Sequence, residues 1–379
     1  MPVYNRLFAA LLLLAGSLIY TNPAPAANAL PEDRSKAVIL AYTRIGEDDK
    51  PDESLTEEQF IAHIREIKTG GYHVLPLPDI LDHLENNRPL PPLTLAITLD
   101  GAYRSAMQNA VPHLLAENLP FTVFYAADPL DQHDSDYASW QDLKSLKKHK
   151  NVTLATLPAS YSHVAHATRT EMLAALNKAR QRHREEFAAE SPYLAYPFGE
   201  YALELKDLAQ TQGFKAAFGL HSGAAYPGAD LYALPRFTMT EQYGDPDRLR
   251  MVARALPLPT TDIEPADPNI KANSFYTGFT LPGALSTQTE QLSCFISGHG
   301  RASIVQLGNR IEIREDTGLL DDERIRLNCT MPGPNNENNE AQWRWLGLLY
   351  FRNPERDEPR IPPAQNASAY SQSQSSMSP

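Results

Sequence analysis

Between residues 36 and 239, short apolar runs alternate with longer segments in which apolar residues recur every three or four positions. The runs have the length of strands, and the segments between them have the length and periodicity of helices. Consecutive strands separated by helices pair in parallel, because a parallel pair needs a long crossover connection. The alternation therefore predicts an α/β barrel or an open α/β sheet. The expected strands are 36–42, 72–75, 95–100, 121–126, 152–157, 193–197, 214–219 and 233–239.

The pattern changes after about Leu256. Prolines, aspartates and threonines dominate the next residues, and short strand-like segments punctuated by glycines follow. The last residues are rich in Pro, Ser, Gln and Asn and predict a disordered tail. The predicted organisation is a signal peptide (1–29), an α/β domain (30–256), a linker (257–272), a small all-β domain (273–351) and a disordered tail (352–379).

The N-terminus resembles a secretory signal peptide. Arg6 precedes an apolar run over 7–19, and the small-residue triplets Ala24-Pro25-Ala26 and Ala27-Asn28-Ala29 follow. The run is shorter than a comfortable membrane span, although an uncleaved anchor is the alternative. We expect an exported protein, periplasmic or secreted, with no stable membrane span after cleavage.

Export implies an oxidising compartment, where cysteines form disulfides. The chain has two cysteines, Cys294 and Cys329, and both lie in the expected β domain. A disulfide between them would contribute about 3–4 kcal/mol by the chain-entropy model. The formal net charge of −12 argues against nucleic-acid and anionic-membrane partners, since both need a basic surface.

The strand over 95–100 ends in a carboxylate, Asp100, followed by Gly101. An acid at the carboxyl end of a parallel strand is placed where active sites form, so Asp100 is a candidate catalytic residue. Its alternative role is to cap the next helix, which contributes about 1 kcal/mol. Paired-carboxylate chemistry with Glu200 is a further possibility whose geometry the sequence does not fix. The sequence contains no G-x-S-x-G nucleophile elbow, no phosphate-binding glycine loop after a strand and no C-x-x-C pair.

Three segments resemble motifs of the polysaccharide deacetylase family, also known as the nodulation-B homology domain or carbohydrate esterase family 4. They are 98–103 (Thr-Leu-Asp-Gly-Ala-Tyr), 195–199 (Ala-Tyr-Pro-Phe-Gly) and 234–237 (Leu-Pro-Arg-Phe), and the resemblance extends over roughly 36–254. It implies a deformed (β/α) barrel that hydrolyses the acetamide of N-acetylated glycans or polysaccharides. In active members one aspartate and two histidines hold a divalent, zinc-like metal, and a second aspartate acts as base towards the metal-bound water.

Residue by residue, the resemblance weakens where the chemistry takes place. The base falls on Asp100, but the three metal-ligand positions fall on Gly101, Leu157 and Tyr161. None of these residues is a good ligand for a zinc-like ion, so we expect no metal cofactor. His163 and His166 are weak alternative ligands that a shift in register would bring into play.

The third motif is better preserved. In the family this segment forms one wall of the groove, and a backbone N–H there supports the oxyanion; the alternative is a turn that needs Gly199 for its backbone. The expected substrate-binding residues, which could equally pack the rim of the barrel, are Tyr103, Arg104, Tyr196, Pro197, Phe198 and Gly199.

The sequence thus favours an envelope protein that binds N-acetylated glycans and has lost or impaired metal-dependent deacetylase activity. One alternative is an active hydrolase of acetamide carbon–nitrogen bonds that uses Asp100 with His163 or His166, or no metal. A purely structural envelope protein is a third hypothesis.

Overall fold

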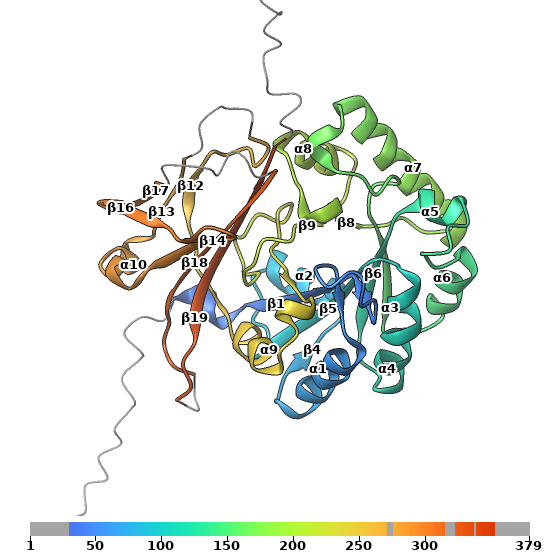
Figure 1. Ribbon diagram of the computed structural model, residues 1–379, viewed down its shortest axis with the longest axis horizontal. Coiled ribbons are helices and arrows are strands. Elements are labelled where there is room, and N and C mark those ends of the chain that lie inside the picture. The colour runs from blue at the N-terminus through green and yellow to red at the C-terminus, as the bar shows by residue number, and fades with distance from the viewer. Residues whose placement is uncertain (1–29, 271–275, 315–322, 337–338, 353–379) are drawn as a thin grey trace, which may run out of the picture.

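The computed structural model describes residues 30–270, 276–314, 323–336 and 339–352. They form a β/α barrel and a β domain that lie side by side (Figure 1). The expected signal peptide, and the expected tail apart from Arg352, lie outside the described residues. Of the helices in the described ranges, none has both the length and the apolarity that a bilayer crossing requires.

The barrel is built on a parallel sheet with the strand order β10-β1-β5-β6-β7-β8-β9, and β4 pairs with the start of β5. This arrangement confirms the expected deformed barrel. An isolated parallel bridge joins Phe218 of β9 to Leu234, in the segment that precedes β10. The strands are β1 (Ala37–Tyr42), β4 (His73–Val74), β5 (Thr94–Gly101), β6 (Phe121–Tyr125), β7 (Val152–Thr156), β8 (Tyr193–Ala195), β9 (Ala216–Phe218) and β10 (Phe237–Thr238).

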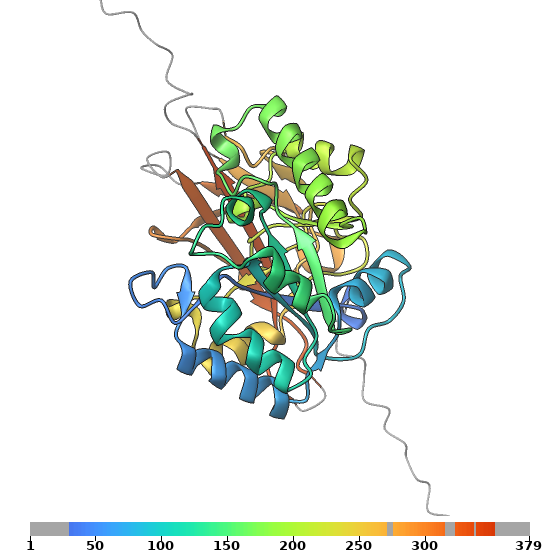
Figure 2. The same cartoon turned by 90° about the vertical axis from the view of Figure 1, so that its right-hand side faces the viewer.

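Helices alternate with these strands and surround the sheet; Figure 2 shows them in front of the orange strands of the β domain. Thr56, Ser139 and Thr168 start α1, α6 and α7 with capping boxes, in which the cap side chain and the third helical residue satisfy each other's backbone N–H groups. The helices are α1 (Glu57–Thr69), α2 (Leu77–Glu85), α3 (Arg104–Asn109), α4 (Val111–Ala116), α5 (Ala127–Asp131), α6 (Trp140–Leu146), α7 (Arg169–Phe187), α8 (Leu203–Thr211) and α9 (Pro246–Ala253). A short parallel pair, β2 (Arg44–Ile45) and β3 (Ser54–Leu55), follows β1.

The two faces of the barrel sheet pack into separate apolar clusters. Large aliphatic residues such as Leu40 and Ile97 pack in one cluster with the helices α1 and α4. Small residues such as Ala96 and Ala155 pack in the other cluster, together with the rings of Phe124 and Phe218. Small side chains on that inner face leave room for a large polar group in the middle of the barrel.

The β domain contains two sheets, with the orders β11-β19-β18-β14-β15 and β12-β13-β17-β16. They enclose an apolar core, in which Cys294 of β14 and Cys329 of β18 are directly paired in register and form the expected disulfide. The elements are β11 (Leu256–Pro257), β12 (Thr261–Glu264), β13 (Thr277–Thr280), α10 (Gly283–Ser286), β14 (Ser293–Ile296), β15 (Gly300–Arg301), β16 (Ser303–Leu307), β17 (Arg310–Arg314), β18 (Arg324–Pro332) and β19 (Trp343–Phe351).

The stretch 257–272 is not a linker in its described part, to residue 270. β11 pairs in parallel with β19, and β12 pairs antiparallel with β13. Both are edge strands, where proline is tolerated because one side of the strand has no ladder to complete. The proline-rich composition that suggested a linker therefore belongs to the edges of the β domain.

The β domain packs against the segment between β9 and β10, where Gly223 forms an isolated antiparallel bridge with Leu346 of β19. Trp345 of β19 packs edge-to-face on Phe237 of β10, with ring centroids 5.2 Å apart. Gly347 approaches the backbone of Ser222 so closely that a Cβ would lie 2.4 Å from its atoms. At the start of the described chain, Asp33 forms a bidentate ion pair with the buried Arg344 at 2.7 Å.

Candidate functional site

Asp100 lies at the carboxyl end of β5 and forms a buried ion pair with Arg236, which precedes β10. Nη1 and Nη2 of the guanidinium donate to the two carboxylate oxygens at 2.6 and 2.7 Å. Asp100 is 2% exposed and Arg236 is 0% exposed. Both oxygens of Asp100 are therefore engaged by one planar cation inside the barrel.

The guanidinium of Arg236 is held from several further sides. Its Nε donates to the carbonyl of Gly219 at 2.9 Å, and Nη1 also donates to Thr98 Oγ1 at 3.1 Å. Its carbon lies 5.3 Å from the ring centroid of Phe124 and 5.9 Å from that of Phe218. The capping role considered for Asp100 is wrong, because α3 has no side-chain cap and Asp100 is committed to Arg236.

Gly101 ends β5 with a φ of +89°, in the region that favours glycine. A Cβ built there would lie 2.4 Å from a ring carbon of Tyr103. That ring is itself fixed, since it stacks on Tyr137 at 4.6 Å and carries the guanidinium of Arg44 at 3.6 Å. The space next to Gly101, where the resemblance would place a ligand carboxylate, is thus filled by an aromatic ring.

Leu157 and Tyr161 lie near Gly101, as the resemblance requires. The N–H of Leu157 donates to the carbonyl of Tyr125 at 2.8 Å, and Gly101 pairs with the same Tyr125 from the other side of β6. Tyr161 contacts Tyr103 with ring centroids 6.2 Å apart and stacks on Phe198 at 4.9 Å. Burial raises the pKa of the Tyr161 phenol, so it stays protonated at neutral pH.

These residues do not fit the metal that the resemblance implies. Gly101 and Leu157 offer no donor atom, and a protonated phenol is a poor ligand for zinc. Within the described ranges, no group of three or more His, Cys, Asp or Glu side chains is arranged to hold an ion.

The two alternative histidines lie beside the mouth of the barrel, in a different environment from Asp100. His163 Nδ1 is 2.7 Å from Oε1 of the buried Glu200, and its ring stacks on Phe198 at 3.9 Å. The ring of His166 is 6.2 Å from that of His163. Both histidines line a pocket of about 530 Å³ under the loop 158–167, and Asp100 does not line it.

Glu200 connects this loop to the β domain. Its Oε2 accepts the backbone N–H of Val164 at 2.9 Å, and Oε1 forms an ion pair with Arg324 of β18 at 3.2 Å. Arg324 also donates to the carbonyl of Phe198. The carboxylate is thus a junction between loop and domain, and each carboxylate of the glycosidase alternative is engaged by an arginine, Asp100 by Arg236 and Glu200 by Arg324.

The third motif forms a tight 3₁₀ turn over Pro197–Gly199. Phe198 has a φ of +54° and Gly199 a φ of +75°, and a Cβ on Gly199 would lie 2.5 Å from the backbone nitrogen of Leu220. The N–H of Gly199 donates to the carbonyl of Tyr196 at 2.9 Å, so this N–H serves the turn. Phe198 lines the mouth of the barrel, and Pro197 lines the pocket under the loop 158–167.

Two of the expected substrate-binding side chains are engaged elsewhere. Tyr196 is fully buried, and its hydroxyl donates to the carbonyl of Tyr232 at 2.8 Å. Arg104 donates to the backbone carbonyls of Ser135 at 2.5 Å and Tyr137 at 2.8 Å. The structure places neither side chain in the lining of the mouth.

The mouth itself is a pocket of about 690 Å³ above the carboxyl ends of the strands. We call it the mouth pocket. The barrel contributes an aromatic group formed by Tyr103, Tyr161 and Phe198, and the β domain contributes Arg324 and Arg326. Hydroxyl and carboxylate groups complete the lining, at Thr43, Thr238, Thr240, Ser297, Asp52, Glu53 and Glu323.

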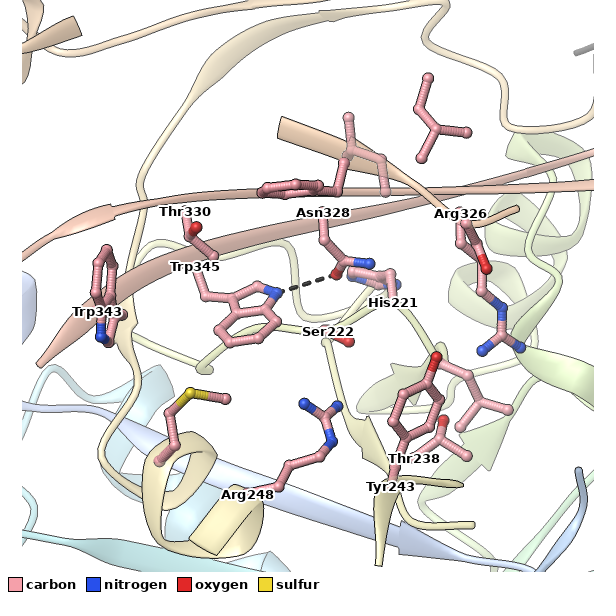
Figure 3. Close-up of a pocket in the computed structure, with 16 residues that line it drawn as sticks. His221, Ser222, Thr238, Tyr243, Arg248, Arg326, Asn328, Thr330, Trp343 and Trp345 are labelled. Carbon is pink, nitrogen blue, oxygen red and sulfur yellow. Dashed lines mark hydrogen bonds between the residues drawn. The ribbon is translucent and has the colours of Figure 1, made fainter. Parts of the chain in front are cut away.

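A further pocket, of about 440 Å³, lies between the barrel and the sheet that contains β18 and β19 (Figure 3). We call it the interdomain pocket. It shares Leu220, Thr238, Ser297 and Arg326 with the mouth pocket, so the two are adjacent along one interface.

Sequence reasoning named Arg236 only as part of the motif over 234–237 and gave it no role, and it did not foresee the contribution of the β domain. Arg236 is a lone charge in an apolar segment that was expected to be a strand, which is a detectable sign of a buried partner. For the β-domain residues, the sequence offered as a signal only the alternation of large and polar side chains over 324–332 and 343–351.

Comparisons with known proteins agree with this fold. Residues 87–217 match the family model described as polysaccharide deacetylase. A poly-β-1,6-N-acetyl-D-glucosamine N-deacetylase of Staphylococcus aureus (strain MSSA476) is 22% identical over 199 residues, which cover 50% of this chain and 68% of that protein.

Two solved structures share the fold at low sequence identity. The Streptococcus pyogenes deacetylase PplD, solved in complex with acetate, superposes with a TM-score of 0.53 at 16% identity and covers 57% of this chain and 98% of its own. IcaB from Ammonifex degensii gives a TM-score of 0.53 at 18% identity, with 58% and 98% covered. Residues 87–217 therefore match the polysaccharide deacetylase family model, and the barrel shares the fold of these solved deacetylases.

Proposed function

We propose that this protein binds N-acetylated glycans at the mouth pocket and has lost the metal-dependent deacetylase activity of its family. One observation carries the proposal: the three positions that the resemblance assigns to metal ligands hold Gly101, Leu157 and Tyr161, and the Tyr103 ring fills the space next to Gly101. Asp100, at the base position, has both carboxylate oxygens engaged by Arg236. These contacts remove the metal-bound water and the free base that the reaction needs.

The mouth pocket keeps features that suit a sugar. The aromatic group of Tyr103, Tyr161 and Phe198 offers apolar contact surface to a pyranose, while threonine hydroxyls and the two arginines offer hydrogen bonds. The volume of about 690 Å³ lies within the usual range of small-ligand sites. The relative named a poly-β-1,6-N-acetyl-D-glucosamine N-deacetylase supports an N-acetylated glycan as the ligand class.

The same proposal includes an exported location, periplasmic or secreted. It is supported by the signal-peptide pattern of the first 29 residues and by the disulfide between Cys294 and Cys329, which is typical of oxidising compartments.

Metal content, acetate release and glycan binding test this function together. We expect purified protein to hold no stoichiometric divalent metal and to release no acetate from tetra-N-acetylchitotetraose or poly-β-1,6-N-acetylglucosamine. We expect saturable binding of one of these glycans that is lost in Phe198→Ala. Tyr276→Ala, at an exposed tyrosine of the β domain outside the mouth pocket, is the matched control. Acetate release that needs metal and disappears in Asp100→Asn would overturn the proposal.

A second candidate function, hydrolysis with a non-standard site, is favoured by the pair His163–Glu200. His163 Nδ1 lies 2.7 Å from Oε1 of Glu200, which also pairs with Arg324 at 3.2 Å, so a carboxylate orients the imidazole through Nδ1. A base oriented by a carboxylate in this way is common in hydrolases. Acetate release that His163→Gln abolishes and Asp100→Asn preserves would select this candidate over the first.

A further inference from the structure

The interdomain pocket is distinct from the site of the proposed function in its chemistry. The sheet of β14, β18 and β19 turns one row of side chains into the core of the β domain and the alternate row towards the barrel. The alternate row brings Arg326 and Asn328 from β18 and Trp343 and Trp345 from β19 into the pocket (Figure 3). The barrel adds Arg248 from α9 and other side chains on the opposite side.

Aromatic rings give the pocket flat apolar surface. Trp343 is 40% exposed, and Trp345 is held in place by a hydrogen bond from its Nε1–H to Asn328 Oδ1 at 3.0 Å. Tyr243 lies on the barrel side, and the guanidinium of Arg248 packs on its ring at 4.5 Å. A partly exposed, oriented indole in a concave site is suited to stacking against a pyranose ring.

Two cations face this pocket without an anion. Arg248 and Arg326 form no ion pair with any carboxylate in the described part of the chain, although acidic residues outnumber basic ones by 46 to 34. Other arginines nearby are paired: Arg250 with Glu66 at 3.0 Å and Arg324 with Glu200 at 3.2 Å. The pocket therefore holds positive charge that the described residues do not neutralise.

Buried polar atoms in the same pocket also lack partners. Nε of Arg248 and Oγ1 of Thr238 are buried without a hydrogen bond to any described residue. A buried polar atom that lacks a hydrogen bond is unfavourable in the folded chain. Burial also lowers the pKa of Arg248 and of Arg326, as it does for cations taken out of water.

We propose that the interdomain pocket is a subsite for an acidic sugar, a pyranose that carries a carboxylate, within a glycan. The carboxylate pairs with Arg248 and Arg326, whose planar guanidinium groups match its geometry, and the ring stacks on Trp345. A highly charged polyanion such as nucleic acid fits less well, because the chain carries a net charge of −12. The pocket of about 440 Å³ is within the range of small-ligand sites.

A comparison of acids with their methyl esters tests this subsite. Intrinsic tryptophan fluorescence of the full chain is followed at low ionic strength with trigalacturonate, triglucuronate and trimannuronate, and with the methyl ester of each, none of which carries an N-acetyl group. We expect saturable binding of at least one acid, about tenfold or more tighter than its ester. We also expect this binding to weaken with added salt and to persist in Phe198→Ala, which separates it from binding in the mouth pocket.

Arginine variants assign the binding to the pocket. Arg248→Gln should weaken binding of the acid about tenfold or more and leave the ester unchanged. Arg250→Gln, on the same helix but paired with Glu66 outside the pocket, should bind like the unmodified chain. No saturation by any of the acids up to about 10 mM, equal affinity for acid and ester, or an equal loss in both variants would overturn the proposal.

Discussion

Asp100 and Gly101 are neighbours in the chain, but the structure gives them opposite roles. Asp100 is enclosed with Arg236 in the barrel, and Gly101 provides the positive φ and the empty volume that admit the Tyr103 ring. The sequence shows which residues occupy the positions that the resemblance assigns to metal ligands. It could not show what packs beside Gly101, since Arg44, Tyr103 and Tyr137 meet only through the fold.

The ion pair of Asp100 and Arg236 should be among the most sensitive points of the barrel. Arg236→Met leaves a buried carboxylate without its cation, and such losses cost about 3–5 kcal/mol. We expect urea unfolding to show a loss of that size. Arg250→Met, which breaks a surface pair with Glu66, should cost about 1 kcal/mol or less. Similar losses in the two variants would mean that the buried pair has no special structural role.

The ring of Tyr103 should block a carboxylate at position 101. Gly101→Asp meets both a φ of +89° and a ring atom 2.4 Å from its Cβ, so we expect a loss of about 1–3 kcal/mol. Tyr103→Ala removes the ring, and in the double variant the effect of Gly101→Asp should be smaller, with the coupling read from a double-mutant cycle of urea unfolding. Strictly additive losses would show that the ring is not the obstacle.

At the scale of elements, a buried hydrogen bond between a histidine and a tyrosine attaches each of two helices to the barrel sheet. His63 of α1 is hydrogen-bonded to Tyr42 of β1 at 3.0 Å and to the carbonyl of Gly244 at 2.9 Å. His183 of α7 is hydrogen-bonded to Tyr125 of β6 at 2.7 Å. Burial lowers the pKa of both histidines to about 4, so both are neutral in the folded chain at neutral pH.

Acid should therefore destabilise the attachment of these helices. The pKa of an unfolded histidine is about 6.5, so below that pH the unfolded chain binds protons that the folded chain excludes. Stability falls as the pH is lowered from about 6.5 towards 4, by about 1.4 kcal/mol per pH unit for each histidine, and these groups contribute nothing above that window.

Urea unfolding at pH 7, 6 and 5 measures this dependence. We expect His63→Gln to reduce the pH slope of the unfolding free energy by about one proton, and the exposed His149→Gln to leave it unchanged. An unchanged slope in His63→Gln would show that this histidine is not held neutral.

Helices and strands with strong periodicity were predictable from local sequence, and segments defined by their neighbours were not. The strands over 95–100 and 121–126 were both expected and are β5 and β6. The stretch 257–272 was expected to be a linker, because prolines lower strand propensity and an edge pairing leaves no local pattern. The helix α9 is short and was missed, although it carries Arg248 to the interdomain pocket.

At the scale of the molecule, the barrel and the β domain are joined by an aromatic contact and by ion pairs. Phe237 packs on Trp345, Glu200 pairs with Arg324, and the N-terminal Asp33 pairs with Arg344 of the β domain. The family resemblance predicted the barrel, but it does not extend to the β domain and therefore predicted nothing about that domain. The β-domain side of the mouth pocket and of the interdomain pocket therefore could not be assigned from the sequence.

These contacts predict that the two domains unfold as one unit. In scanning calorimetry we expect a single transition whose calorimetric and van't Hoff enthalpies agree. Removing the disulfide with Cys294→Ala and Cys329→Ala weakens only the β domain directly, by about 3–4 kcal/mol in the chain-entropy model. If the barrel depends on the β domain that packs against the segment between β9 and β10, the whole transition moves to lower temperature. A second transition that stays at the original temperature would instead show that the barrel is stable without the β domain.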